Sequence, residues 1–175
     1  WDIQVIKLDG TNRTPLEGVE FGLYSEAGEL LDTGFTQADG KLVFEDVPWG
    51  AQYQIRELSP LTGYLPLSPV DVTVRRGDKL IELETVNERR PVEIQVLKTD
   101  GETEQPLGGV EFGLYTEDGS LIQTGVSDEN GRAVFSPVPW GQTVYLKEIN
   151  AKDGYLPVEQ PLKIELHPED QLLEF

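Results

Sequence analysis

The sequence predicts an all-β protein made of two tandem immunoglobulin-like β-sandwiches. Short alternating or β-branched runs are bounded by Gly, Pro, Asp and Asn, and no stretch keeps the 3.6-residue period of a helix. The chain also repeats itself: Lys7 returns as Lys98, Glu57 as Glu148 and Tyr64 as Tyr155, a constant spacing of 91 residues. A repeat of this size indicates two copies of one domain, which we place at residues 1–90 and 91–175.

Seven strands are expected in the first copy, which suits an immunoglobulin-like sandwich. The first four each end at a turn or proline signal, and the last three alternate apolar and polar residues. In chain order they are Asp2–Leu8, Val19–Tyr24, Leu30–Thr36, Lys41–Glu45, Gln52–Leu58, Val70–Arg75 and Leu80–Val86. Turns are expected at Glu26-Ala27-Gly28, Ala38-Asp39-Gly40 and Arg76-Gly77-Asp78. The second copy repeats this pattern after a short junction that contains Pro91, so we expect the two sandwiches to lie end to end.

The composition excludes several classes of function. A formal net charge of −18 and a pI near 4.3 argue against nucleic acid and anionic membrane surfaces as partners. The absence of cysteine excludes disulfides and thiolate metal sites, and no motif suggests a metal or another cofactor. There is no signal peptide or transmembrane run, and the chain opens mid-pattern on Trp1, so we interpret it as a segment of a longer protein.

Charged residues fall where strand alternation predicts core positions. Lys7 shares a strand face with Trp1, Ile3 and Val5, and Glu57 shares one with Tyr53 and Ile55. Ile81, Leu83, Thr85 and Asn87 form a third such row. The second copy places Lys98 and Glu148 in the same way. An inward lysine and an inward glutamate should meet, because burying either ion alone is costly.

Two interpretations of this pair stay open at this point. One is a buried salt bridge, or side chains at strand ends that reach solvent. The other is chemical: burial favours the neutral amine and the neutral acid, so the lysine becomes a nucleophile and the acid polarises an amide. If Asn87 supplies that amide, the product is a Lys–Asn isopeptide bond with loss of ammonia.

Both copies resemble the CnaB-type repeat of Gram-positive collagen adhesins, a SpaA-like prealbumin fold also found in pilins. The resemblance rests on a K-x-D strand, then P-L-x-G-V-E-F-x-L-Y, a D-G or N-G turn, Y-x-[IL]-x-E and G-Y. These blocks are Lys7/Asp9, Pro15–Tyr24, Asp39-Gly40, Tyr53–Glu57 and Gly63-Tyr64. In the second copy they are Lys98/Asp100, Pro106–Tyr115, Asn130-Gly131, Val144–Glu148 and Gly154-Tyr155, with Val144 in place of the first tyrosine.

The resemblance implies an isopeptide bond between Lys7 and Asn87, with Glu57 assisting its formation. The second copy departs from this pattern. After Pro157 the copies slip to a spacing of 92, so Asp78 matches Asp170 and the equivalent of Asn87 falls beyond Phe175. Asn150 cannot take the place of this asparagine, because it lies two residues after Glu148 and not on the last strand. We therefore expect a truncated last strand in the second copy, with Lys98 and Glu148 lacking an asparagine partner within this chain.

The predicted function is a structural stalk or spacer of a bacterial surface adhesin or pilus-like protein. It is not an enzyme, since the crosslinking is a single self-modification. The implied location is extracellular, with cell-wall anchoring through regions outside this chain. The implied partners are neighbouring domains of the same protein, with host matrix protein or glycan bound by a tip domain elsewhere. The alternatives are a ligand-binding adhesin domain or an accessory domain of a secreted enzyme.

Three further features are expected to be structural. Trp49 and Trp140 should cap the core at turns, although a ligand-binding domain would expose them. Asp128, Glu129 and Asn130 fit a hairpin turn better than a calcium loop. His167 has no catalytic or metal-ligand partner nearby in sequence and is expected at the surface.

Overall fold

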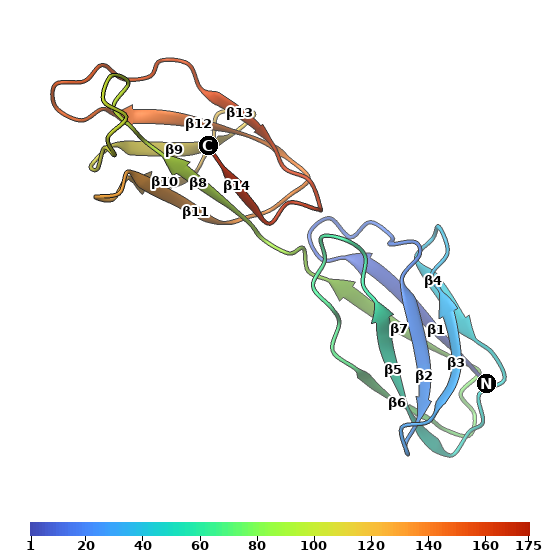
Figure 1. The fold of residues 1–175 in the computed structure, drawn as a ribbon. Coiled ribbons are helices and arrows are strands. Elements are labelled where there is room, and N and C mark those ends of the chain that lie inside the picture. The colour runs from blue at the N-terminus through green and yellow to red at the C-terminus, as the bar shows by residue number, and fades with distance from the viewer. The chain divides into compact units, whose positions relative to one another are not determined.

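The computed structural model describes residues 1–175, which divide into two units, Trp1–Arg89 (unit 1) and Arg90–Phe175 (unit 2). Each unit contains two β-sheets and no helix, and Figure 1 shows the two layers of strands within each. This architecture confirms the predicted all-β sandwich fold. No helix of the length and hydrophobicity needed to cross a membrane occurs in the structure.

Unit 1 packs a three-stranded sheet on a four-stranded sheet. The first has the order β4-β1-β7, with β1 at Asp2–Asp9, β4 at Lys41–Phe44 and β7 at Leu80–Asn87. The second has the order β3-β2-β5-β6, with β2 at Glu20–Ser25, β3 at Leu30–Phe35, β5 at Ala51–Ser59 and β6 at Val70–Val74. Every strand end lies within about one residue of its prediction, because alternation and turn residues are local signals.

Unit 2 repeats this arrangement. Its three-stranded sheet, β11-β8-β14, consists of β8 at Val92–Leu97, β11 at Arg132–Val138 and β14 at Leu172–Glu174. Its four-stranded sheet, β10-β9-β12-β13, consists of β9 at Glu111–Thr116, β10 at Leu121–Val126, β12 at Thr143–Asn150 and β13 at Leu162–Glu165.

The first and last strands of each unit lie side by side and run parallel, whereas all other strand pairs are antiparallel. In unit 1, Lys7 of β1 lies opposite Thr85 of β7, and Asp9 lies opposite Asn87. Such parallel pairing within one small sandwich brings the two ends of the domain's chain onto adjacent strands.

The core of unit 1 lies between its two sheets and is apolar except at one end. Ile3 and Val5 of β1 face Phe21 of β2 and Ile55 of β5, and all four are fully buried. Trp1 was also predicted to face the core, but it is 40% exposed. That prediction was wrong because pairing with β7 begins at Asp2, so Trp1 lies outside the strand whose alternation was extended to it.

Candidate functional site

A lysine, a glutamate and an asparagine meet inside unit 1. Nζ of Lys7 lies 3.0 Å from Oε2 of Glu57, and neither side chain has any exposed area. Nδ2 of Asn87 donates a hydrogen bond of 3.1 Å to Oε1 of Glu57, and Asn87 is 1% exposed. The Glu57 carboxylate therefore lies within reach of the Lys7 amine through one oxygen and of the Asn87 amide through the other.

Strand register explains why these three side chains converge. Lys7 and Asn87 come from the neighbouring strands β1 and β7, and both point inward, as alternation along each strand requires. Glu57 comes from β5 in the facing sheet, where it lies opposite Phe21 of β2. The site thus joins the two layers of the sandwich, with the amine and the amide on one side and the carboxyl group on the other.

The backbone of Lys7 is fixed by the turn that precedes β4. Its N–H donates to the carbonyl of Gly40 at 2.7 Å, and its own carbonyl accepts from Leu16 at 2.9 Å. Gly40 has φ of 74°, and a Cβ atom there would lie 2.5 Å from the Lys7 carbonyl oxygen. Position 40 of the predicted Asp-Gly turn must therefore be glycine.

The surroundings of the Lys7 amine are apolar. Nζ lies 5.6 Å from the centre of the Phe21 ring. Burial lowers the pKa of Lys7 below its usual value, and the opposing hydrogen bond and charge of Glu57 offset this only in part. Apart from their contact with each other, Nζ and the facing Oε2 of Glu57 are buried without a hydrogen-bond partner, and Oδ1 of Asn87 is buried without a donor. Burial therefore favours the unprotonated, nucleophilic form of the amine.

A second buried cluster adjoins this site, and sequence reasoning assigned it no role. Asp9 is fully buried, and its Oδ2 accepts hydrogen bonds from the Tyr64 hydroxyl at 2.5 Å and from Nε of Arg89 at 3.0 Å. Its Oδ1 accepts from the backbone N–H groups of Thr11 and Asn12. The available signal was the return of Asp9 as Asp100 and of Tyr64 as Tyr155.

These contacts shift the pKa values of both acidic groups. Burial acts to raise the pKa of Asp9, but the hydrogen bonds from Tyr64, Asn12, Thr11 and Arg89 outweigh it, so the pKa falls below its usual value. Burial and the bond to Asp9 raise the pKa of Tyr64 to about 12. The contact between the tyrosine hydroxyl and the aspartate carboxylate is thus maintained from mildly acidic to strongly basic solution.

The raised pKa of Tyr64 predicts a loss of stability at high pH. Because the folded chain holds this proton more tightly than the unfolded chain, its contribution is complete below about pH 10 and declines as pH rises towards 12. We expect Tyr64→Phe to flatten this decline in urea unfolding curves recorded between these values. Tyr53→Phe is the control, because that hydroxyl donates to the Pro48 carbonyl and not to a carboxylate. An unchanged decline in Tyr64→Phe contradicts the assignment.

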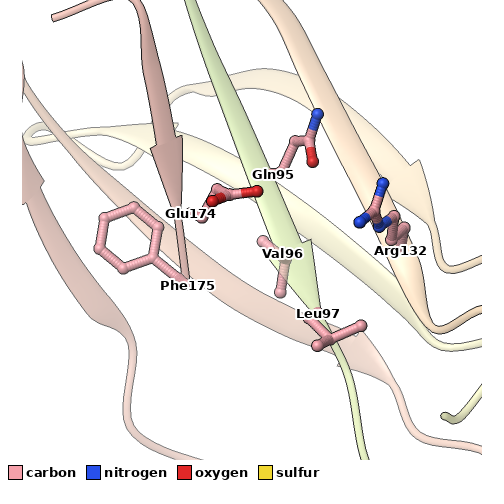
Figure 2. A pocket seen from close by; sticks show the side chains of 6 residues that line it. All are labelled: Gln95, Val96, Leu97, Arg132, Glu174 and Phe175. Carbon is pink, nitrogen blue, oxygen red and sulfur yellow. The ribbon is translucent and has the colours of Figure 1, made fainter.

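Unit 2 brings only two of the corresponding side chains together. Nζ of Lys98 lies 3.2 Å from Oε2 of Glu148, and the lysine side chain is 21% exposed. Asn150 donates instead to Glu111 at the surface. β14 pairs with β8 up to Glu174 opposite Gln95, a register equivalent to Glu82 opposite Gln4 in unit 1. Figure 2 shows Glu174 and Phe175 beside Gln95, Val96 and Leu97 of β8, where these residues and Arg132 line a pocket.

The tryptophans of the two repeated turns differ. Trp140 is buried, as expected for a cap on the core, but Trp49 is 51% exposed, so the same expectation was wrong there. The guanidinium of Arg76 lies over the Trp49 ring at 5.7 Å from its centre, and the residue equivalent to Arg76 in unit 2 is Pro168.

Asp128 closes the expected hairpin turn, because its carboxylate accepts hydrogen bonds from the backbone N–H groups of Asn130 and Arg132. His167 is exposed, as expected.

Comparison with known proteins gives several relatives. The chain is 27% identical to the serine-aspartate repeat-containing protein D of Staphylococcus aureus in an alignment 166 residues long, which covers 82% of this chain and 12% of that protein. The chain thus spans about an eighth of the length of the curated relatives it matches.

Among solved structures, the Bacillus anthracis TIE protein matches with a TM-score of 0.61 and 23% identity, over 99% of this chain and 32% of that one. A streptococcal ancillary pilin matches with a TM-score of 0.46 and 23% identity, over 99% of this chain and 61% of that one. At these identities the first structure supports the fold alone.

The family comparison covers nearly the whole chain. The model of the SpaA prealbumin-like fold domain matches twice, at residues 1–89 and 92–174. These two matches coincide closely with unit 1 and unit 2 of the structure. The chain therefore belongs to the SpaA family of prealbumin-like fold domains and carries two copies of that domain.

Proposed function

We propose that this chain is a structural stalk module of a bacterial surface protein, and that unit 1 is stabilised by an isopeptide bond between Lys7 and Asn87. The observation that carries the proposal is the contact of one buried carboxyl group, that of Glu57, with both the Lys7 amine and the Asn87 amide. A buried salt bridge alone would explain the lysine and the glutamate, but it would not require a buried asparagine at the same carboxyl group.

The reaction needs no external reagent. A proton moves from the Lys7 ammonium to Glu57, which leaves a neutral amine and a neutral acid. Half a turn of the Asn87 amide then presents Oδ1 to the acid proton and makes Cγ more electrophilic. Nζ of Lys7 attacks Cγ, the Cγ–Nδ2 bond breaks, and the leaving nitrogen departs as ammonia with a proton taken from the lysine nitrogen through Glu57. The sandwich supplies the proximity that this uncatalysed condensation lacks in water.

The position of the bond explains its mechanical value. β1 opens unit 1, β7 closes it, and the two strands run parallel, so tension on the two ends of the unit acts along this pair in shear. A covalent bond from Lys7 to Asn87 carries that tension directly between the strands. The remaining strands then bear little of the load, which suits a module whose role is to separate other parts of a protein.

The resemblance of both units to CnaB-type repeats of Gram-positive surface proteins supports a surface location for such a module. The Staphylococcus aureus relative is named for its serine-aspartate repeats, and the matching family model is that of the SpaA prealbumin-like fold domain. Membership of the SpaA prealbumin-like family agrees with a structural rather than an enzymatic role. We propose an extracellular location, neighbouring domains of the same protein as partners, and wall anchoring and any host contact through other regions.

Mass spectrometry of the intact chain tests the bond. Formation of the isopeptide bond is expected to lower the mass by about 17 Da, one ammonia, because a new bond replaces the asparagine amide. Glu57→Ala and Lys7→Ala are both expected to restore the full mass. Glu148→Ala is the matched control in unit 2 and is expected to leave the wild-type loss unchanged. A wild-type chain of full mass contradicts the crosslink and leaves the fold assignment intact.

A further inference from the structure

The three residues of the second buried cluster come from the same parts of unit 1 as the three reacting residues. Asp9 follows Lys7 by two residues at the end of β1, and Arg89 follows Asn87 by two residues after the end of β7. Tyr64 lies in the segment that follows β5, the strand that carries Glu57. Each of these three parts of the chain therefore contributes one residue to the reaction site and one residue to the neighbouring cluster.

The contacts of this cluster close the end of β7 onto β1. Nε of Arg89 and the Tyr64 hydroxyl donate to the same oxygen, Oδ2 of Asp9. The backbone adds two bonds at this place, from Gly10 N–H to the Asn87 carbonyl and from Leu65 N–H to the Glu88 carbonyl, both at 2.9 Å. The Arg89 side chain is 14% exposed and that of Asp9 is 1% exposed, so the ion pair is largely removed from water.

Such a closure matters because Asn87 is the last residue of its strand. Strand ends open readily, and an open β7 end would carry the amide away from the Lys7 amine. A misplacement of about 1 Å lowers the rate of a reaction that depends on proximity by up to about a hundredfold. Holding the residue two positions beyond Asn87 restricts the asparagine before any covalent bond exists.

Unit 2 repeats the tyrosine–aspartate half of this cluster. The Tyr155 hydroxyl donates to Oδ2 of Asp100 at 2.6 Å, and the backbone N–H groups of Glu102 and Thr103 donate to Oδ1. The tyrosine–aspartate half is therefore the same in both units. In unit 1, Arg89 connects this half to the strand that carries Asn87.

We infer that Asp9, Tyr64 and Arg89 form a positioning latch that holds the end of β7 against β1 so that Lys7 and Asn87 react. The inference rests on the proposed isopeptide bond. These are positioning residues, because the hydrogen bonds that define the cluster join them to one another and to the backbone. The latch acts before the bond forms, and its effect is on the rate of crosslinking.

The test follows crosslinking of the full chain as it is made. Chains synthesised in a cell-free system are quenched in acid at timed intervals, and the fraction that has lost one ammonia is measured by intact mass. Arg89→Ala and Asp9→Asn are expected to slow this loss by about tenfold or more. Tyr64→Phe, which removes one hydroxyl, is expected to slow it less, and Arg89→Lys to recover part of the rate.

Two controls separate positioning from stability. Glu84→Ala removes an exposed ion pair between β7 and Arg13 without changing the turn that holds the Asp9 carboxylate, and it is expected to react at the wild-type rate. Val72→Ala destabilises the core of unit 1 from β6 and is also expected to react at that rate. Wild-type rates for Arg89→Ala and Asp9→Asn, or equal slowing by Val72→Ala, overturn the latch.

Hydrogen exchange distinguishes failure of the latch from failure of the crosslink. In Lys7→Ala, which has no amine to react, Asp9→Asn is expected to speed exchange of the Gly10 and Leu65 amides that bond to the end of β7. Unchanged exchange overturns the latch whether or not the bond forms. If the wild-type chain shows no mass loss, the proposed bond and the effect of the latch on its rate are both overturned. Faster exchange in the double variant would then still show that the cluster closes the end of β7 onto β1.

Discussion

Pulled by its two ends, wild-type unit 1 is expected to resist extension, whereas Asn87→Ala is expected to release nearly the whole domain. The bond spans about 80 residues, so its absence frees roughly 260–290 Å of extended chain. The reason is the parallel pairing of β1 and β7, which places Lys7 and Asn87 directly between the points where force enters and leaves. Single-molecule force spectroscopy of the full chain measures this length.

Unit 2 provides an internal reference in the same experiment. It holds Lys98 beside Glu148, and Asn150, which follows Glu148 by two residues, binds Glu111. We therefore expect one extension event, from unit 2, in the wild type and two in Asn87→Ala. Two events of similar length in the wild type contradict a covalent connection across unit 1. Asn87→Ala suits this test because it leaves the Lys7–Glu57 pair intact.

Replacement of Glu57 is expected to destabilise unit 1 even more than replacement of Asn87. Asn87→Ala removes the crosslink, and by the loop-entropy estimate this costs about 4 kcal/mol, or about 15–30 °C in the unfolding midpoint of a domain of this size. Glu57→Ala removes the same bond and also leaves Lys7, which has no exposed side-chain area, without its partner. Breaking a buried pair in this way costs about 3–5 kcal/mol more.

Calorimetry of the full chain measures the two midpoints. Glu148→Ala is the matched control, since the Lys98 side chain is 21% exposed and keeps access to water when its partner is lost. Its effect on unit 2 is expected to be the smallest of the three. Equal midpoints for Asn87→Ala and Glu57→Ala contradict the buried position of the Lys7 amine.

The inward direction of the reacting residues was predictable, because alternation along a strand is a local property. Lys7 follows Ile3 and Val5, and Glu57 follows Tyr53 and Ile55, so each inherits the face of its buried neighbours. The same rule failed for Trp1, since alternation holds only within the paired strand. The repeated spacing of 91 residues also predicted two copies of one fold, as the family match shows.

The latch was not predictable in the same way. Tyr64 lies between strands, where no periodicity fixes the direction of a side chain, and its contact with Asp9 joins residues 55 positions apart. Arg89 follows the last strand and would ordinarily be read as a solvated charge at a domain boundary. Trp49 is exposed and Trp140 is buried although the VPWG turns that carry them are identical, so the local sequence does not determine their burial.

The parallel pairing of β1 and β7 has a consequence for how such a domain changes over time. In the proposed function, the requirements for bearing tension are concentrated in two of its seven strands and one residue of a third, Glu57. The outward faces of β2, β3 and β6 are therefore free to accept new side chains, charges or longer loops without weakening the tether. A lineage of these domains is expected to diversify in its outer faces while its opening and closing strands stay nearly fixed.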